Sequence, residues 1–200
     1  MRRARMLLWA LVALAAVAGA ALFLALPSRA PAPLTASSSS VAELGGAFTL
    51  TGSDGQPFAS SRLAGRPFAI FFGFTHCPDV CPTTLARLAR LRKTLGRGDE
   101  SFAIVFVSVD PERDKPADMG RYTGLFGTPV IGLTGSVAAI ERVKKQFGIF
   151  SRKAPQPGGD YSVDHTATVL LFDRAGRFTS TIATDEGDSP ALDKLKALTA

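Results

Sequence analysis

The chain has 200 residues, of which 46% are hydrophobic, 23 are basic and 17 are acidic. That length fits one domain with additional segments better than two full domains. Four of the basic residues and none of the acidic ones fall within the first 42 positions, which leaves 19 basic against 17 acidic residues. This nearly neutral remainder gives no support for nucleic-acid binding. The basic excess belongs to the first 42 residues, which are predicted to lie at a membrane.

The first predicted element is a membrane-spanning helix. Met6 to Leu26 is an uncharged apolar run of 21 residues, and as a helix of about 31 Å it matches the hydrocarbon core of a bilayer. Arg2, Arg3 and Arg5 precede it, so residues 1–5 are expected to stay cytoplasmic. The alternative is a cleaved signal peptide, whose apolar region is usually shorter. Under both interpretations the remainder of the chain is exported.

A flexible spacer and one folded domain are predicted to follow. Residues 27–42 are rich in Pro, Ala and Ser, which is typical of a linker. The domain is expected over residues 43–200, where strand and helix patterns alternate. In chain order we expect a hairpin over 48–55, a buried strand over 67–74, and then a helix with Pro82 in its first turn. The apolar face of this helix consists of Leu85, Leu88, Leu91 and Leu95. After it we expect a buried strand over 102–109, a helix over 116–125, a strand over 129–133, a helix capped by Ser136, a loop over 150–161, a hairpin of 167–172 and 177–183, and a closing helix from Asp188 or Ser189. This order predicts a central mixed sheet flanked by helices.

The chain has two cysteines, Cys77 and Cys81. A pair in an exported protein often forms a structural disulfide, but so short a loop gains little chain entropy from closure. The pair follows the first long strand where the next helix begins, and a helix N-terminus lowers a thiol pKa. On a helix this spacing places both residues on one face, about 5–6 Å apart. A metal site and a redox pair are therefore both open.

Histidine is equally scarce, with only His76 and His165. His165 follows the Pro/Gly-rich loop, from where it can approach the cysteine turn. Two thiolates and one imidazole suit Cu(I), and with an added oxygen ligand they can hold Cu(II). The alternative for His165 is a loop histidine bonded to the backbone. His76, at the end of the preceding strand, is expected to point elsewhere and to serve a surface or partner contact.

Acidic residues accompany both parts of this candidate site. Asp79, between the cysteines, is expected either to cap the helix or to contact a partner. Asp164, beside His165, is expected to orient the imidazole or to supply a weak oxygen ligand. We predict that Asp110 to Asp114 (DPERD) form a turn with internal ion pairs. The alternative is that this segment is a docking surface.

Three ordered segments carry a family resemblance. They are Gly73 to Leu85 (GFTHCPDVCPTTL), Val107 to Asp114 (VSVDPERD) and Val163 to Thr166 (VDHT). Together with the N-terminal anchor and spacer, they resemble the Sco (SenC) copper proteins over residues 43–198. The resemblance implies a thioredoxin-like α/β fold. It also implies that Cys77, Cys81 and His165 bind copper as Cu(I) and Cu(II).

The same resemblance implies a function. Members of the family assist assembly of the dinuclear copper (CuA) site of cytochrome c oxidase subunit II. We therefore expect a metallochaperone anchored in the inner (cytoplasmic) membrane, with its domain on the periplasmic side, or on the intermembrane-space side in a mitochondrion. Expected partners are subunit II and a copper donor chaperone, and the soluble domain is expected to be monomeric.

Two other functions are weighed against copper delivery. The first is a thiol–disulfide reductase that uses Cys77 and Cys81 to keep the subunit II cysteines reduced. Reductases of this kind usually have Cys-x-x-Cys and a facing proline, and neither is present here. The second is a peroxidase of related fold, which would use a lone cysteine of low pKa. The nearby second cysteine and His165 argue against it.

Overall fold

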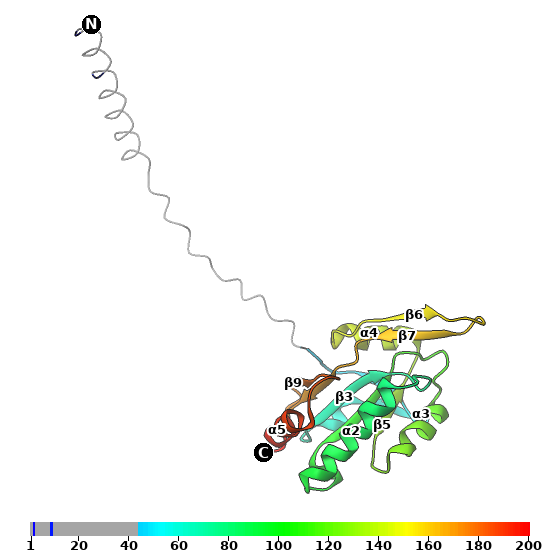
Figure 1. Cartoon of the computed structure of the whole chain (residues 1–200). Coiled ribbons are helices and arrows are strands. Elements are labelled where there is room, and N and C mark those ends of the chain that lie inside the picture. The colour runs from blue at the N-terminus through cyan, green and yellow to red at the C-terminus, as the bar shows by residue number, and fades with distance from the viewer. Residues whose placement is uncertain (1, 3–8, 10–43) are drawn as a thin grey trace. The chain divides into compact units, whose positions relative to one another are not determined.

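The structure is a computed structural model that describes residues 2, 9 and 44–200. Within 44–200 the chain forms nine strands and four α-helices (Figure 1). The strands are β1 (Thr49–Gly52), β2 (Pro57–Ala59), β3 (Phe68–Gly73), β4 (Ala103–Ser108), β5 (Ile131–Thr134), β6 (Ser151–Pro155), β7 (Tyr161–His165), β8 (Val169–Phe172) and β9 (Phe178–Ile182). The helices are α2 (Val80–Leu95), α3 (Pro116–Thr123), α4 (Val137–Gln146) and α5 (Asp188–Leu198), with short 3-10 turns at Ser60–Leu63, Asp99–Ser101 and Gly124–Phe126.

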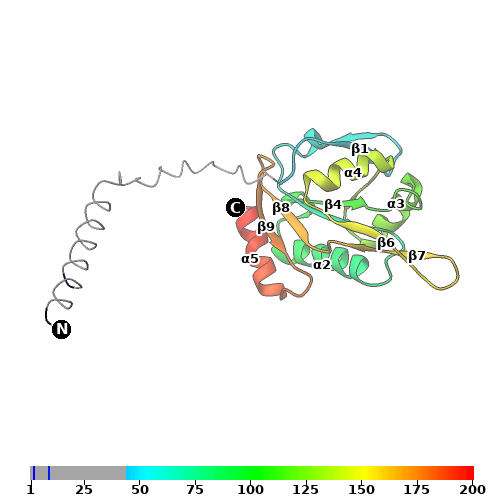
Figure 2. The same cartoon turned by 90° about the horizontal axis from the view of Figure 1, so that it is seen from above.

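Seven of the strands form one mixed sheet in the order β2-β1-β5-β4-β3-β8-β9. The central strands β3, β4 and β5 are parallel, and the outer pairings are antiparallel. Figure 2 shows α2 and α5 on one face of the sheet and α4 on the opposite face. Every residue of β3 and β4 is buried, as expected for parallel strands covered on both faces. The predicted mixed sheet flanked by helices is confirmed.

The helix that carries the cysteines forms as its leucine spacing predicts. Leu85, Leu88 and Leu91 of α2 are buried, and Leu95 packs against the core. Pro82 lies in the first turn, where its missing N–H has no intrahelical acceptor to lose. The predicted cap of α4 is also confirmed, because Ser136 Oγ accepts a hydrogen bond from the backbone N–H of Ala139 at 3.2 Å.

The prediction of a loop over residues 150–161 is wrong. β6 occupies Ser151–Pro155 and pairs antiparallel with β7, forming a two-stranded sheet separate from the main one. His165 is the last residue of β7 and pairs with Ser151, so it does not lie in a loop. The hairpin escaped sequence analysis because β6 has no buried residue, and an exposed polar strand gives no alternation of apolar side chains.

The predicted membrane helix over residues 6–26, the preceding residues 1–5 and the spacer over 27–42 lie outside the described residues, apart from Arg2 and Trp9. Among the positions that the structure describes, no helix is both long and apolar enough to cross a bilayer. The division of the chain into these segments and a domain over 43–200 stays a prediction.

Candidate metal centre

The cysteines lie in the turn between β3 and α2. Cys77 precedes the helix, and its backbone N–H donates to Phe74 O at 3.2 Å. Cys81 falls in the first turn of α2, where its backbone N–H donates to Cys77 Sγ at 3.3 Å. Cys81 is fully buried and Cys77 is partly exposed, and both are free thiols. Cys77 is therefore the more exposed cysteine of the pair.

Gly73, the last residue of β3, makes room for the buried sulfur. A Cβ atom at this position would stand 2.6 Å from Cys81 Sγ and 2.9 Å from Phe106 Cε2. Real Cβ atoms essentially never come within 3.0 Å of another heavy atom, so a side chain here would displace the sulfur. Sequence analysis did not single out Gly73. The signal available was a glycine interrupting an otherwise apolar strand just before the cysteine turn.

The β6–β7 hairpin brings His165 to this turn. His165 Nε2 lies 3.5 Å from Cys81 Sγ, across 84 positions of sequence. The other ring nitrogen, Nδ1, is 3.1 Å from Val163 O. The imidazole also packs edge-on against the rings of Phe74 and Phe71, with centroid separations of 5.7 and 6.2 Å. The hairpin backbone and two aromatic rings thus orient the ring toward the cysteine.

The two thiols differ in their pKa values. A hydrogen bond from the Cys81 thiol lowers the pKa of Cys77 from 9.0 to about 5; partial burial opposes this, and the backbone N–H groups of Cys81 and Asp79 assist it. The same hydrogen bond, together with burial, raises the pKa of Cys81 well above its ordinary value. At neutral pH the pair therefore consists of a Cys77 thiolate and a Cys81 thiol.

The donor set suits a soft metal ion. Two sulfurs and an imidazole are ligands that Cu(I) and similar ions prefer, and a sulfur–nitrogen separation of 3.5 Å fits metal bonds of about 2.0–2.3 Å to each atom. Within residues 44–200, however, no three His, Cys, Asp or Glu side chains already have the arrangement of a formed metal centre.

The neighbouring polar residues have other contacts. Asp79 occupies the N-cap position of α2 but makes no side-chain bond to the helix backbone, and instead accepts from Thr83 Oγ1 at 3.1 Å. The Asp164 carboxylate pairs with Arg152 at 2.8 Å, and adjacent residues of a strand point to opposite faces. That Asp164 orients the imidazole or supplies a weak oxygen ligand stays a prediction. His76 Nδ1 lies 3.1 Å from Thr75 Oγ1 and 3.6 Å from Asp114 Oδ1.

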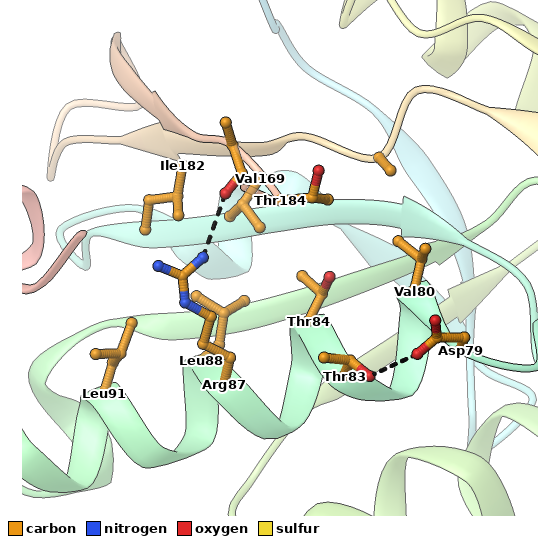
Figure 3. Close-up of a pocket in the computed structure, with 12 residues that line it drawn as sticks. Asp79, Val80, Thr83, Thr84, Arg87, Leu88, Leu91, Val169, Ile182 and Thr184 are labelled. Atoms are coloured by element: carbon orange, nitrogen blue, oxygen red, sulfur yellow. Dashed lines mark hydrogen bonds between the residues drawn. The ribbon is translucent and has the colours of Figure 1, made fainter. Parts of the chain in front are cut away.

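A cavity of about 220 Å³ borders the cysteine turn between α2, β8 and β9 (Figure 3). Asp79 and Val80 stand at one end, and Leu88, Val169 and Ile182 contribute apolar surface. Its basic residue, Arg87, donates hydrogen bonds to Ala183 O, Glu186 O and Asp188 Oδ1, so the guanidinium already has partners. No cysteine or histidine lines this cavity, and it is not part of the donor set.

The fold and the paired thiols beside an imidazole define a thioredoxin-like protein with a candidate site for a soft metal ion. The family model described as SCO1/SenC matches residues 36–200, and this chain belongs to the SCO1/SenC family. It is 34% identical to "Protein SCO2, mitochondrial" of Saccharomyces cerevisiae over 156 residues, covering 76% of this chain and 52% of the relative. It is 32% identical to a "SCO2-like protein" of Rickettsia felis over 182 residues, covering 88% of this chain and 89% of the relative.

Solved structures share the fold. The structure of Bradyrhizobium japonicum ScoI with copper bound matches with a TM-score of 0.70 and 40% identity, over 78% of this chain and 99% of that one. The thioredoxin-like fold that the sequence resemblance implies is confirmed. The chain spans about half the length of the yeast relative and 89% of the Rickettsia felis relative.

Proposed function

We propose that this chain binds one copper ion through Cys77, Cys81 and His165 and delivers it to the CuA site of cytochrome c oxidase subunit II. The observation that carries the proposal is the 3.5 Å approach of His165 Nε2 to Cys81 Sγ, which joins the cysteine turn to a distant hairpin. The match to a solved ScoI with copper bound supports the choice of metal.

The chemistry of the donors supports a carrier of both oxidation states. Two sulfurs hold Cu(I) with little help, whereas Cu(II) is harder and depends more on a nitrogen or oxygen ligand. The partial exposure of Cys77 leaves one ligand accessible to an incoming thiolate of the recipient. Ligand exchange at that sulfur provides a route for passing the ion on, and the cargo leaves without a change in the fold.

The proposal includes a location and partners. Residues 6–26 anchor the chain in the inner membrane, residues 27–42 act as the spacer, and the domain faces the periplasm or the intermembrane space. A second chaperone supplies the copper, and the domain works as a monomer. A reporter that is active only outside the cytoplasm, fused after Ala200, is expected to be active. An inactive fusion together with an active cytoplasmic reporter contradicts this topology.

One observation favours a second function, reduction of the oxidised subunit II cysteines. A Cys77 thiolate with a pKa of about 5 beside a buried Cys81 thiol is the asymmetry of a thiol–disulfide reductase. The Cys77 thiolate attacks one sulfur of the partner disulfide, whose S–S bond breaks, so that a mixed disulfide forms and the other partner sulfur leaves as a thiolate. Cys81 then attacks the Cys77 sulfur, its proton passes to the departing partner thiolate, and the chain is left oxidised.

The two functions separate in one experiment. The copper-loaded chain is mixed with a reduced fragment of subunit II, and the metal-free dithiol is mixed with the oxidised fragment. Copper delivery predicts metal transfer in the first mixture at a rate above that from free copper–chelator complexes. Reduction without transfer supports the second function and contradicts the first. His165→Ala is the matched variant, because it impairs a metal carrier while leaving both cysteines of a reductase in place.

A further inference from the structure

The hairpin that carries His165 is not part of the main sheet. β6 and β7 pair only with each other, so no strand pairing fixes their position relative to the cysteine turn. Val163 is the one buried residue of the two strands. The position of the imidazole therefore depends on side-chain contacts between the hairpin and the rest of the domain.

Arg113 makes several of these contacts. Its Nη1 donates to Asp160 Oδ1 at 3.0 Å and to Tyr161 O at 2.9 Å, both in the hairpin. Its Nε donates to Asp110 Oδ2 at 2.5 Å, and Asp110 is almost fully buried. The guanidinium carbon lies 3.8 Å from the centre of the Tyr161 ring, and the Tyr161 hydroxyl donates to Asp110 Oδ1 at 2.9 Å. Charge-assisted bonds and stacking of this kind are stronger than exposed ion pairs.

Residues 110–114 also contact the segment that precedes the cysteines. Asp114, whose side chain is fully buried, accepts hydrogen bonds from the Thr75 backbone N–H at 3.0 Å and from the Thr75 hydroxyl at 2.6 Å. Thr75 lies two residues before Cys77. The backbone N–H of Asp114 donates to Asp110 O at 2.9 Å, so the two carboxylates are parts of one closed turn.

Arg113 also contacts the aromatic packing around the imidazole. Its guanidinium carbon is 5.9 Å from the centre of the Phe74 ring, and that ring packs edge-on against His165. Segment 110–114 therefore contacts the residues before the cysteines through Asp114. It contacts the hairpin through Asp110 and Arg113, and through an exposed ion pair of Glu112 with Lys153. A single turn joins the two halves of the candidate site.

We propose that residues 110–114 form a bracket that sets the spacing between Cys81 and His165, with Arg113 as its positioning residue. The inference rests on the proposed function for its consequence, since a fixed hairpin matters to copper only if His165 is a ligand. Without the guanidinium, the hairpin moves away from the domain while the main sheet and α2 stay folded. Binding that depends on the imidazole weakens more than binding that depends on the two sulfurs.

The bracket itself is tested by hydrogen exchange on the metal-free, reduced full-length chain. In Arg113→Ala we expect the amides of β6 and β7 to exchange at least about tenfold faster, with the amides of β3, β4 and α2 unchanged. Arg152→Ala is the matched control, because Arg152 forms an exposed ion pair with Asp164 within the same hairpin and such pairs contribute little. Exchange that stays within about twofold of the wild type in the hairpin, or rises equally throughout the domain, overturns the bracket.

A second variant covers the case in which Arg113→Ala does not fold. Tyr161→Phe removes only the hydrogen bond to Asp110 and keeps the ring that stacks on Arg113. It is expected to accelerate hairpin exchange alone, by a smaller factor than Arg113→Ala. Unchanged hairpin exchange in this variant counts against the bracket.

Copper titration then separates the bracket from the proposed function. Competition against chelators is expected to show about 10–100-fold weaker Cu(II) binding in Arg113→Ala, as is usual for a residue that orients a ligand, and a smaller loss for Cu(I). A wild-type chain that binds no copper overturns the proposed function, whatever the exchange data show. Normal copper binding with normal hairpin exchange in Arg113→Ala overturns the bracket alone.

Discussion

Replacing Gly73 by alanine tests how tightly the buried cysteine is held. The added Cβ would stand 2.6 Å from Cys81 Sγ, 2.9 Å from Phe106 Cε2 and 3.2 Å from Phe71 Cε1. Comfortable contacts between heavy atoms lie at about 3.5–4.0 Å, so the sulfur or the strand has to shift by about 1 Å. Both rings are fully buried and cannot move outward. The sulfur is therefore expected to move relative to His165.

The energetic cost follows from the same geometry. Inserting a methyl group into a packed core costs about 1–3 kcal/mol, and the lower entropy of the unfolded alanine chain returns about 0.4–1 kcal/mol. The net expectation is a destabilisation of about 1–2 kcal/mol. With a urea m-value of about 2 kcal/mol/M, the middle of the usual range, the unfolding midpoint falls by about 0.5–1 M.

Urea unfolding of the reduced, metal-free chain, followed by circular dichroism, measures this shift. Gly124→Ala is the matched control, because Gly124 is exposed, has an ordinary negative φ, and its Cβ would meet no atom within 4 Å. The control is expected to be neutral or slightly stabilised. If Gly73→Ala is as stable as the control, the contact between Gly73 and the sulfur does not constrain the site, and the reasoning is wrong.

Three further predictions concern the thiols, the helix contacts and the domain. Alkylation of Cys77 in the reduced chain should show a titration midpoint near pH 5, which should move toward 9 in Cys81→Ala. Because the folded pKa of Cys77 lies below its unfolded value, the contribution of this thiol to stability is complete above pH 9 and is lost as the pH falls through 5. An alkylation midpoint near 9 in the wild type is inconsistent with the hydrogen-bonded pair. Arg87→Ala should destabilise the chain by about 1–3 kcal/mol, because it leaves the carbonyls of Ala183 and Glu186 without this donor. Arg90→Ala loses only an exposed ion pair with the same Asp188 and should cost about 0–1 kcal/mol. Equal losses of stability in urea unfolding refute the distinction. A chain that begins at Val41 should be a folded monomer by light scattering and circular dichroism, and aggregation or loss of structure places the domain boundary elsewhere.

The sequence was most informative where apolar patterns were strong. The run from Pro67 to Phe74 predicted β3 because a strand buried on both faces is continuously apolar. The leucine spacing predicted α2 for the corresponding reason. The candidate site followed from the scarcity of cysteine and histidine, and from the family resemblance of the segments around them.

Other features depend on contacts that no local pattern encodes. β6 has no buried residue, so its pairing with β7 leaves no periodic signal of apolar side chains. The link from Arg113 to Tyr161 spans 48 positions, and charged residues in a turn look the same in sequence whether they face solvent or hold a hairpin. Gly73 within an apolar strand signals a close approach by another group, but only the folded chain shows that this group is the Cys81 sulfur.

The most direct test of the site is electron paramagnetic resonance of the Cu(II)-loaded chain labelled with 15N-histidine. Coordination by His165 predicts nitrogen coupling that changes with the label, disappears in His165→Ala and persists in His76→Ala, where the other histidine of the chain is removed. Loss of either cysteine is expected to abolish tight binding of both Cu(I) and Cu(II). Coupling that persists in His165→Ala and is lost in His76→Ala contradicts the proposed set of Cys77, Cys81 and His165.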